Sequence, residues 1–505
     1  MRVKHRIEEV LEIESSDEYI AKKFHCIEGK DEVNDFIEYA DNKGLVMHFH
    51  YNDDTKEASL YHISSKNAEA VDAVIPSHVL NYQVTKIGDQ TEIDRDSVIA
   101  TVVIPNTVKT IGDYAFSYLN CYTGSITIPD SVTSIGKHVF SYSVLTELFI
   151  PRSVTFIGEG AFCGCEQLAS IIVDKRNRFF DSRGNCNAIV STKENKLIAG
   201  CKTTRIPGSI KEIGNKAFEK CGITAIDLPS SLEKIGEEAF ISCEGLIEVF
   251  IPRNTSQIAS GCFSGCPRLA SIKVHKKNRF YDSRDNCNAI IETATNTLIQ
   301  GCYNTWIPGS ITKIGIKAFE GCKCFSSMVI PNSVTEIEQY AFADCENLEE
   351  VVLSENITTV GIGAFTNTGL CSLEIPSSLT EMSYFSFATH NLLSIKVDPK
   401  NKVFDSRDNC NAIIETETNK LVIACANTTI PESITEIDSC AFSYTKVQEI
   451  YIPDSVKVIA QYTFMFCTEL KRVIISDPSL LKGSGIGKSV EIISPNQQNA
   501  NTKAQ

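Results

Sequence analysis

The chain has 505 residues, which is too long for one ordinary hydrophobic core, so it forms either several domains or one extended repeat array. With 43% hydrophobic and 22% charged residues the composition is that of a folded chain, and no apolar run approaches the roughly 18 residues that span a bilayer. The formal net charge of −15 argues against a general nucleic-acid binder, which presents excess Lys and Arg to phosphates.

The N-terminal segment, residues 1–44, starts with basic residues and continues as acidic, amphipathic sequence. It contains neither the apolar core nor the small-residue cleavage site of a secretory signal. Either the protein is cytoplasmic or a signal has been removed from it. The role of this segment is not indicated by its residues.

In the next segment, residues 45–93, a strand is expected around His48 and His50. The two side chains alternate along that strand and share a face, which is compatible with a pair of metal ligands. A solvated strand face is the favoured interpretation.

Residues 94–475 repeat one unit, whose clearest copies are IPRSVTFIGEGAFCGCEQLASI from Ile150 and IPNSVTEIEQYAFADCENLEEV from Ile330. The intervals between successive copies are 22 to 24 residues, except for three of 55 or 56. Twelve copies at one period indicate a repeat array. The Phe of the unit falls at Phe116, Phe140, Phe162, Phe218, Phe240, Phe263, Phe319, Phe342, Phe365, Phe387, Phe442 and Phe464.

Each unit predicts one coil of a solenoid. The segment Leu-x-x-Ile-x-Ile alternates apolar and polar positions, as a short strand does, and the Pro that follows ends the strand because it has no N–H. Val-x-x-Ile-Gly predicts a second short segment, and Ala-Phe-x-x-Cys a helical turn. No coil can bury its own apolar edge, so the coils must stack and the Phe residues should form a ladder. The predicted fold is a β-rich leucine-rich-repeat solenoid of short parallel strands and helical turns.

The three long intervals hold related insertions, near residues 174–204, 275–305 and 398–428. Each reads as a β-hairpin, because two apolar runs flank a polar turn. Each also contains two cysteines at the same spacing, and counting outward from the turn places the two opposite each other, within disulfide range. A disulfide and a pair of buried thiols are equally compatible with these pairs, which are Cys186 with Cys201, Cys287 with Cys302 and Cys410 with Cys425.

Other cysteines stand three residues after the ladder Phe, where they are expected as small buried side chains. They are Cys165, Cys221, Cys243, Cys266, Cys322, Cys345 and Cys467.

The IPxSVTxIGxxAFxxC pattern resembles the BspA-type, or Treponema-type, leucine-rich repeats over roughly residues 71–490. The resemblance implies that residues 45–93 form a β-rich N-terminal cap and residues 476–494 a C-terminal cap with SVEIISP as its closing strand. Residues 495–505 are expected to be a disordered tail. The resemblance to this family further implies a bacterial cell-surface or secreted protein that engages host or bacterial proteins.

Alternation within the strands places one residue of each strand outward, and several of these are aromatic or basic. A stripe of exposed apolar side chains suggests a surface that a protein segment or a sugar chain covers, although β-propensity alone also favours such residues in strands. The candidate ligand-binding residues are Phe149, Phe250, Trp306, Tyr451, Lys273 and Arg205.

Basic residues gather at equivalent places in the three insertions and could hold a sulfated polysaccharide or an acidic protein, though solvated charges are the commoner case. They are Lys175, Arg176 and Arg178, then Lys276, Lys277 and Arg279, then Lys400 and Lys402. Arg183, Arg284 and Arg407 follow in the same insertions.

No catalytic, metal or cofactor site is predicted. GSGIGKS at residues 483–489 lacks the first Gly of a phosphate loop, and the loops after Asp282 and Asp405 lack the closing Glu of a calcium loop, so Asp-stabilised turns are expected there. The prediction is a non-enzymatic binding protein whose partner is most plausibly a protein. The alternatives are an intracellular scaffold or sensor and a carbohydrate-binding surface component.

Overall fold

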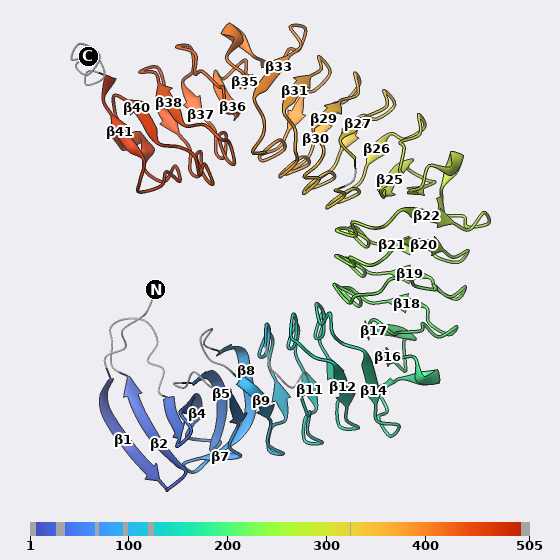
Figure 1. Cartoon of the computed structure of the whole chain (residues 1–505), viewed down its shortest axis with the longest axis vertical. Helices are drawn as coiled ribbons and strands as arrows, with labels where there is room; N and C mark the ends of the chain where they lie inside the picture. Colours follow the sequence, from blue (N-terminus) through green and yellow to red (C-terminus); the bar gives the residue numbers. More distant parts are fainter. Residues whose placement is uncertain are drawn as a thin grey trace. The chain divides into compact units, whose positions relative to one another are not determined.

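The computed structural model describes residues 7–26, 36–65, 70–93, 99–119, 126–323 and 325–495. The chain divides into two compact units. Unit 1 is Met1–Leu246 with Gln257–Cys262, and unit 2 is Ile247–Ser256 with Phe263–Gln505. Each unit is a stack of coils joined by short strands, so the predicted solenoid is confirmed (Figure 1).

Unit 1 contains two larger sheets and two strand pairs. The first sheet runs β1 (Ile7–Ser15), β2 (Tyr19–Cys26), β3 (Phe36–Asp41), β4 (Leu45–Asn52), β5 (Glu57–Ser65), β8 (Tyr82–Ile93), β10 (Thr110–Ile111), β11 (Ser134–Ile135) and β13 (Phe156–Ile157), with β7 (His78–Val79) beside β8. The second runs β15 (Phe180–Asp181), β16 (Ala188–Ser191), β17 (Lys196–Gly200), β18 (Glu212–Ile213), β19 (Lys234–Ile235) and β21 (Gln257–Ile258). The pairs are β6 (Val71–Val74) with β9 (Ile99–Val103), and β12 (Glu147–Ile150) with β14 (Ser170–Val173).

Unit 2 repeats this plan. One sheet runs β23 (Tyr281–Asp282), β24 (Ile290–Glu292), β25 (Thr297–Gln300), β26 (Lys313–Ile314), β28 (Glu336–Ile337), β30 (Thr359–Val360) and β32 (Glu381–Met382), and another β34 (Phe404–Asp405), β35 (Ala412–Glu415), β36 (Lys420–Ala424), β37 (Glu436–Ile437) and β39 (Val458–Ile459). Shorter sheets are β20 (Glu248–Ile251) with β22 (Ser271–Val274), β27 (Ser327–Val329) with β29 (Glu350–Val352), β31 (Ser372–Ile375) with β33 (Ser394–Val397), and β38 (Glu449–Ile452), β40 (Arg472–Ile475) and β41 (Glu491–Ile493).

Helix is scarce in the described part of the chain. It is limited to four 3-10 turns, η1 (Arg183–Asn185), η2 (Arg284–Asn286), η3 (Arg407–Asn409) and η4 (Pro478–Leu481). Within the described ranges no helix has the length and apolar character needed to cross a membrane.

The coil that begins at β12 shows how the repeat produces this structure. Its apolar positions Val154, Ile157, Phe162 and Leu168 are all buried, because each of the three sides of the coil turns one apolar residue or more inward. β12 pairs in parallel with β14 of the next coil, and β13 pairs in parallel with β11 of the previous one. The backbone N–H and C=O groups of both strands of this coil thus find hydrogen-bond partners in the neighbouring coils.

The segment around the ladder Phe differs from the predicted helical turn. Backbone N–H groups of Tyr114, Phe116 and Tyr118 donate to carbonyls of the next coil, each at 2.8 Å, rather than within their own segment. Tyr114 and Tyr118 have φ of 59° and 60°, so the peptide groups alternate in direction and can reach the neighbouring coil. A left-handed residue costs roughly 1–2 kcal/mol. The hydrogen bonds between coils offset that cost.

The Phe ladder is confirmed within each unit. In unit 1 the rings of Phe116 and Phe140 stack with centroids 5.6 Å apart, and in unit 2 Phe342 stacks between Phe319 and Phe365 at 4.9 and 5.0 Å. All five side chains are fully buried.

At the first end of the array, β1–β3 of the N-terminal segment extend the sheet that β4 and β5 begin. β5 then pairs in parallel with β8, which leads the first coil. At the other end β41 pairs with β40 in parallel and adds a last strand. Residues 496–505 of the predicted tail lie outside the described residues.

Candidate functional site: the strand face and the insertions

In each unit the longer strands of the coils form a surface that we call its strand face. In β20, Val249 and Ile251 are buried whereas Phe250 is 49% exposed, so the alternation that the sequence predicts is present. Of the candidate residues, Arg205 and Lys273 are exposed, and Phe149, Trp306 and Tyr451 are each between 43% and 49% exposed. The three aromatic side chains expose a large apolar area, which is typical of a surface that a binding partner covers.

The strand face is not uniform along the chain. In unit 1, Phe149 lies opposite Ile172 in register, and both side chains are exposed. In unit 2, Phe250 lies opposite Lys273. Ile474 also faces outward by alternation, but it is buried.

Trp306 and Arg205, which were expected on strands, lie in no strand. Each stands just after an insertion, and the backbone N–H of Trp306 donates to the carbonyl of Cys287 at 3.3 Å. Unit 2 also has an exposed apolar pair, since Val329 lies opposite Val352. The candidate residues are therefore divided between the two units. Among them, Phe250 and Lys273 lie opposite each other on paired strands.

Two recesses of the strand face could not be located from the sequence. One, of about 620 Å³, lies over β29, β31 and β33 in unit 2, and its polar rim includes Glu350, Glu374 and Lys396. The other, of about 540 Å³, lies in unit 1 between β14 and the first insertion. Both adjoin the place where a strand runs into an insertion.

Each insertion is fixed to the preceding coil by one Asn side chain. In the first, Asn177 Nδ2 donates to the carbonyls of Pro151 and Val154 at 2.9 and 3.0 Å, while its Oδ1 accepts from the N–H groups of Phe179 and Phe180. Asn278 and Asn401 make the same four bonds in unit 2. One buried amide thus positions the whole turn.

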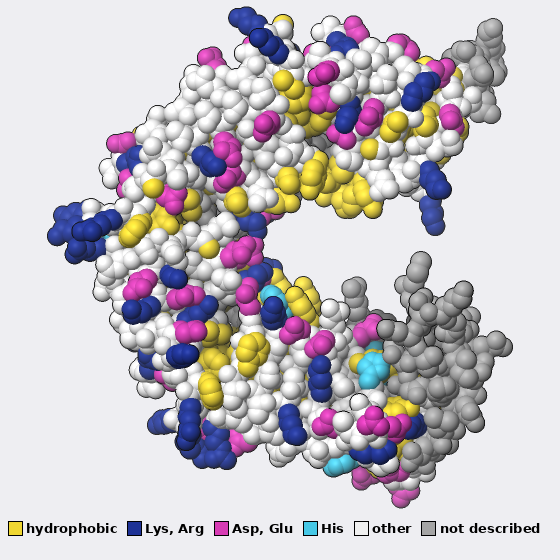
Figure 2. Space-filling view, turned by 180° about the vertical axis from the view of Figure 1, so that it is seen from behind, with side chains coloured by type: hydrophobic (Ala, Val, Ile, Leu, Met, Phe, Trp, Pro, Cys, Tyr) yellow, Lys and Arg dark blue, Asp and Glu magenta, His cyan; other side chains and the backbone are white. Residues whose placement is uncertain are grey.

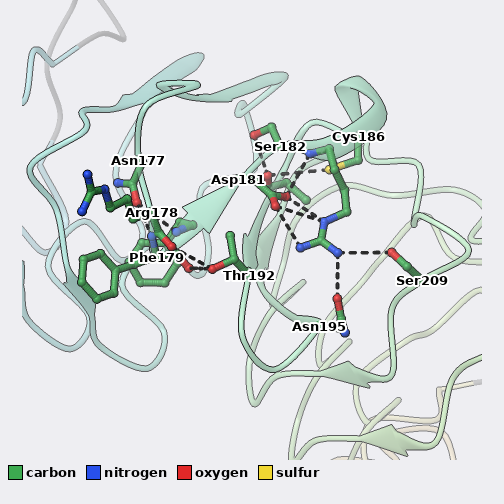
Figure 3. A network of polar contacts seen from close by, with 12 residues as sticks. Asn177, Arg178, Phe179, Asp181, Ser182, Cys186, Thr192, Asn195 and Ser209 are labelled. Atoms are coloured by element: carbon green, nitrogen blue, oxygen red, sulfur yellow. Dashed lines mark hydrogen bonds and ion pairs between the residues drawn. The ribbon is translucent and has the colours of Figure 1, made fainter.

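A second repeated network closes each hairpin (Figure 3). Arg183 Nε and Nη2 donate to the two oxygens of Asp181 at 2.9 and 2.8 Å, and Nη1 donates to Asn195 Oδ1 at 2.7 Å. Arg284 with Asp282, and Arg407 with Asp405, repeat it. These three arginines therefore stabilise the hairpins. Asp282 and Asp405, which begin the sequences that were compared with calcium loops, bind these arginines.

The other basic residues that were expected to form patches in the insertions are exposed. They are Lys175, Arg176, Arg178, Lys276, Lys277, Arg279, Lys400 and Lys402. Figure 2 shows Lys and Arg side chains gathered in groups that project from the edge of the molecule. Arg176 pairs with Asp174 at 2.8 Å.

The insertion cysteines are buried and unpaired in the structure. The register explains why they do not lie directly opposite one another. Val190 pairs with Leu197 as the sequence predicts, but a bulge shifts the next pair to Ile189 with Ala199, so that Cys186 no longer aligns with Cys201. The other two hairpins carry the same bulge.

The cysteines after the ladder Phe are small buried side chains, apart from the half-buried Cys467. Cys165 Sγ donates to the carbonyl of Phe140 at 3.1 Å, and Cys345 Sγ to that of Phe319 at 3.1 Å. A thiol at this position therefore fills the core and binds a carbonyl of the previous coil.

The histidines that were considered as metal ligands lie beside other aromatic and acidic side chains. His48 stacks on His62, with centroids 4.9 Å apart, and its Nε2 lies 3.5 Å from Glu38 Oε2. Across the described ranges no three His, Cys, Asp or Glu side chains are placed to hold a metal ion.

One cysteine does lie beside an imidazole, with Cys163 Sγ 3.3 Å from His138 Nδ1. Burial and the neighbouring Glu219 raise the pKa of the Cys163 thiol, while burial and then Lys216 lower the pKa of His138. Both groups are therefore held neutral, whereas a nucleophilic cysteine requires a thiolate.

Comparisons with known proteins agree with this architecture. The model of the BspA type leucine rich repeat region matches six times, over residues 85–190, 190–289, 300–413 and 410–487. No curated protein matches the sequence.

Several solved structures are similar at low identity. A leucine rich cell surface protein from Faecalibacterium prausnitzii is 22% identical, with 89% of this chain and 98% of that one covered and a TM-score of 0.38. The pneumococcal vaccine antigen PcpA is 16% identical, with 90% and 98% covered and a TM-score of 0.37. A leucine-rich repeat protein from Eubacterium ventriosum is 19% identical, with 68% and 92% covered and a TM-score of 0.40. Because the family model matches most of its length, the chain belongs to the BspA-type leucine-rich repeat family.

Proposed function

We propose that this protein is a non-enzymatic, adhesin-like binding protein of the bacterial cell surface or of the secreted fraction, and that its strand face engages a protein partner. The observation that carries the proposal is the half exposure of large aromatic side chains within unit 2, above all Phe250 on the strand face and Trp306 just after the second insertion. Exposed aromatic side chains are the residue type that most often dominates the binding energy of protein interfaces. Membership of the BspA-type family supports the surface location.

The test is binding of the purified chain to an array of immobilised matrix proteins and glycans, at low and high salt. We expect a salt-resistant protein ligand, with its affinity reduced at least about tenfold in Phe250→Ala/Trp306→Ala. The matched control is Tyr384→Ala/Tyr462→Ala, which removes two similarly exposed aromatic side chains of the same unit away from the strand face. Equal losses in the two double variants, or unfolding of the first, would contradict the assignment.

The second candidate is an intracellular scaffold or sensor. The hairpin register favours it, because the bulge moves Cys186 and Cys201 out of direct opposition and so disfavours a disulfide between them. Thiol titration of the protein taken directly from its cells separates the two. Six oxidised insertion cysteines would support an oxidising location, and six reduced ones the scaffold.

A further inference from the structure

The second insertion differs from the other two in its charge balance. The first insertion begins its turn with Asp174, whose carboxylate accepts from the N–H of Arg176 at 2.8 Å and also pairs with the Arg176 guanidinium. Asp398 accepts from the N–H of Lys400 at 2.8 Å in the third insertion. The second insertion has His275 at this position, and its Nδ1 accepts from the N–H of Lys277 at 3.0 Å. The turn geometry is kept without the carboxylate.

With His275 in place of the Asp, four cations stand in or beside this turn without that carboxylate, and we call them the basic turn: Arg253, Lys276, Lys277 and Arg279. All four are exposed, and no ion pair to a carboxylate is seen for any of them among the residues that the structure describes. Arg253 belongs to the set because Asn278 Nδ2 binds the carbonyls of Pro252 and Thr255 on either side of it. Figure 2 shows a projecting group of Lys and Arg side chains at the place of β22, which leads into this turn.

The overall charge of the protein does not prevent an anion from binding here. At physiological salt the Debye length is roughly 8 Å, so a ligand at the basic turn responds mainly to the nearest charges rather than to the net charge of −15. One carboxylate of the hairpin, Asp282, is already held by Arg284 at 2.9 Å. It therefore does not compete for the four cations of the basic turn.

An exposed aromatic ring lies within the same turn. Phe280 is 47% exposed and follows Arg279 directly, and its N–H is fixed by Asn278 Oδ1 at 2.8 Å. The ring thus stands on a rigid backbone next to a guanidinium. Such a pair suits a ligand that repeats anionic groups and also offers the flat apolar face of a sugar ring.

We propose that the basic turn is a second binding site, beside the strand face, for a sulfated polysaccharide. The two sites adjoin, because the His275 ring packs edge-on against Phe250 with centroids 6.1 Å apart. Lys276, Lys277, Arg279 and Arg253 bind its sulfates, and Phe280 packs against one sugar ring. A linear polymer with a charge on nearly every sugar needs no pocket, which agrees with the position of the cations on an exposed turn. An acidic protein segment would share the charges but not the sugar face.

The test uses the full chain on immobilised heparin, with its desulfated form and poly-glutamate as competitors. We expect retention at roughly 0.15 M salt and release at higher salt, because the attraction is electrostatic and is screened. The variant Lys276→Ala/Lys277→Ala/Arg279→Ala should bind at least about tenfold more weakly. The matched control, Lys109→Ala/Lys137→Ala/Lys488→Ala, removes the same charge from exposed lysines elsewhere and should bind as the wild type does.

A single exchange tests the charge balance itself. His275→Asp restores the carboxylate of the other two insertions within the same turn geometry, so it should weaken heparin binding severalfold. The proposal is overturned if wild type is not retained, if the triple variant and its control bind alike, or if poly-glutamate competes as well as heparin does. Competition by heparin but not by its desulfated form, together with loss in His275→Asp, supports it.

Discussion

Single small residues decide how each hairpin meets the Phe ladder. At the end of the first two hairpins Gly200 and Gly301 lie flat against a ring, and a Cβ on Gly301 would come within 2.1 Å of Phe319 Cε1. The third hairpin has Ala424 at the same place, beside Phe442. There the Phe442 and Phe464 rings are inclined by 26°, whereas Phe319 and Phe342 differ by 4°.

We therefore expect Gly301→Ala to tilt Phe319 and to destabilise the protein by about 1–3 kcal/mol, the usual range for overpacking. Chemical denaturation measures the loss. The matched control is Gly309→Ala, where an added Cβ meets nothing within 4 Å, and its stability should stay within about 0.5 kcal/mol of wild type. A stability for Gly301→Ala equal to that of the control would show that the ring moves at no cost.

At the scale of elements, the insertions depend on one amide each. Asn278→Ala removes two donated bonds of 2.8 and 2.9 Å and two accepted ones of 2.8 and 3.0 Å. Leaving several partly buried backbone groups unbonded should cost about 2–4 kcal/mol and make the second insertion the first site of proteolysis. Asn304→Ala, at an exposed Asn after the same hairpin, is the control. Cleavage at equal rates in the two variants would refute the role of Asn278.

The N-terminal sheet is tied by a charge network whose pH dependence follows from one carboxylate. Bonds from Tyr82, Lys56 and Lys23 lower the pKa of Asp53 to about 2. Because this lies below the unfolded value near 4, the stabilisation is present above about pH 4 and is lost as pH falls through about 2. Asp53→Asn should thus lower stability at pH 7 by at most about 1 kcal/mol, since Asp53 is 59% exposed and screened. The free energies of unfolding of wild type and Asp53→Asn, measured as a function of pH, should converge near pH 2. A constant difference at all pH values would contradict this.

Sequence periodicity predicted the coils because every coil must bury the same positions, and Val334, Ile337 and Phe342 are buried as expected. It did not predict the turns, since aromatic residues such as Tyr114 are rare at positive φ and only hydrogen bonds between coils select that conformation there. The shifted register of the hairpins could not be predicted from the sequence either, because no residue type marks the bulge. The ion pairs of Arg183, Arg284 and Arg407 could have been predicted, however, since Asp stands two residues before Arg in all three insertions.

At the scale of the whole molecule, stability in a solenoid is a sum over neighbouring coils. Each apolar cluster of the core is built from successive coils, and one such cluster in unit 2 includes Phe319, Phe342 and Phe365. A defect in the middle of this cluster should therefore weaken its own coil and the two beside it far more than distant coils.

Phe342→Ala tests this, because its ring is fully buried and stacks on both neighbours. The cavity should cost about 3–5 kcal/mol. In hydrogen exchange, amides between Phe319 and Phe365 should lose most protection, those near Phe442 less, and those at Ile111 and Ile135 of unit 1 should keep wild-type rates. Equal loss of protection in both units would mean that the array unfolds as one cooperative body, and then the local term for each coil is small beside the coupling between coils.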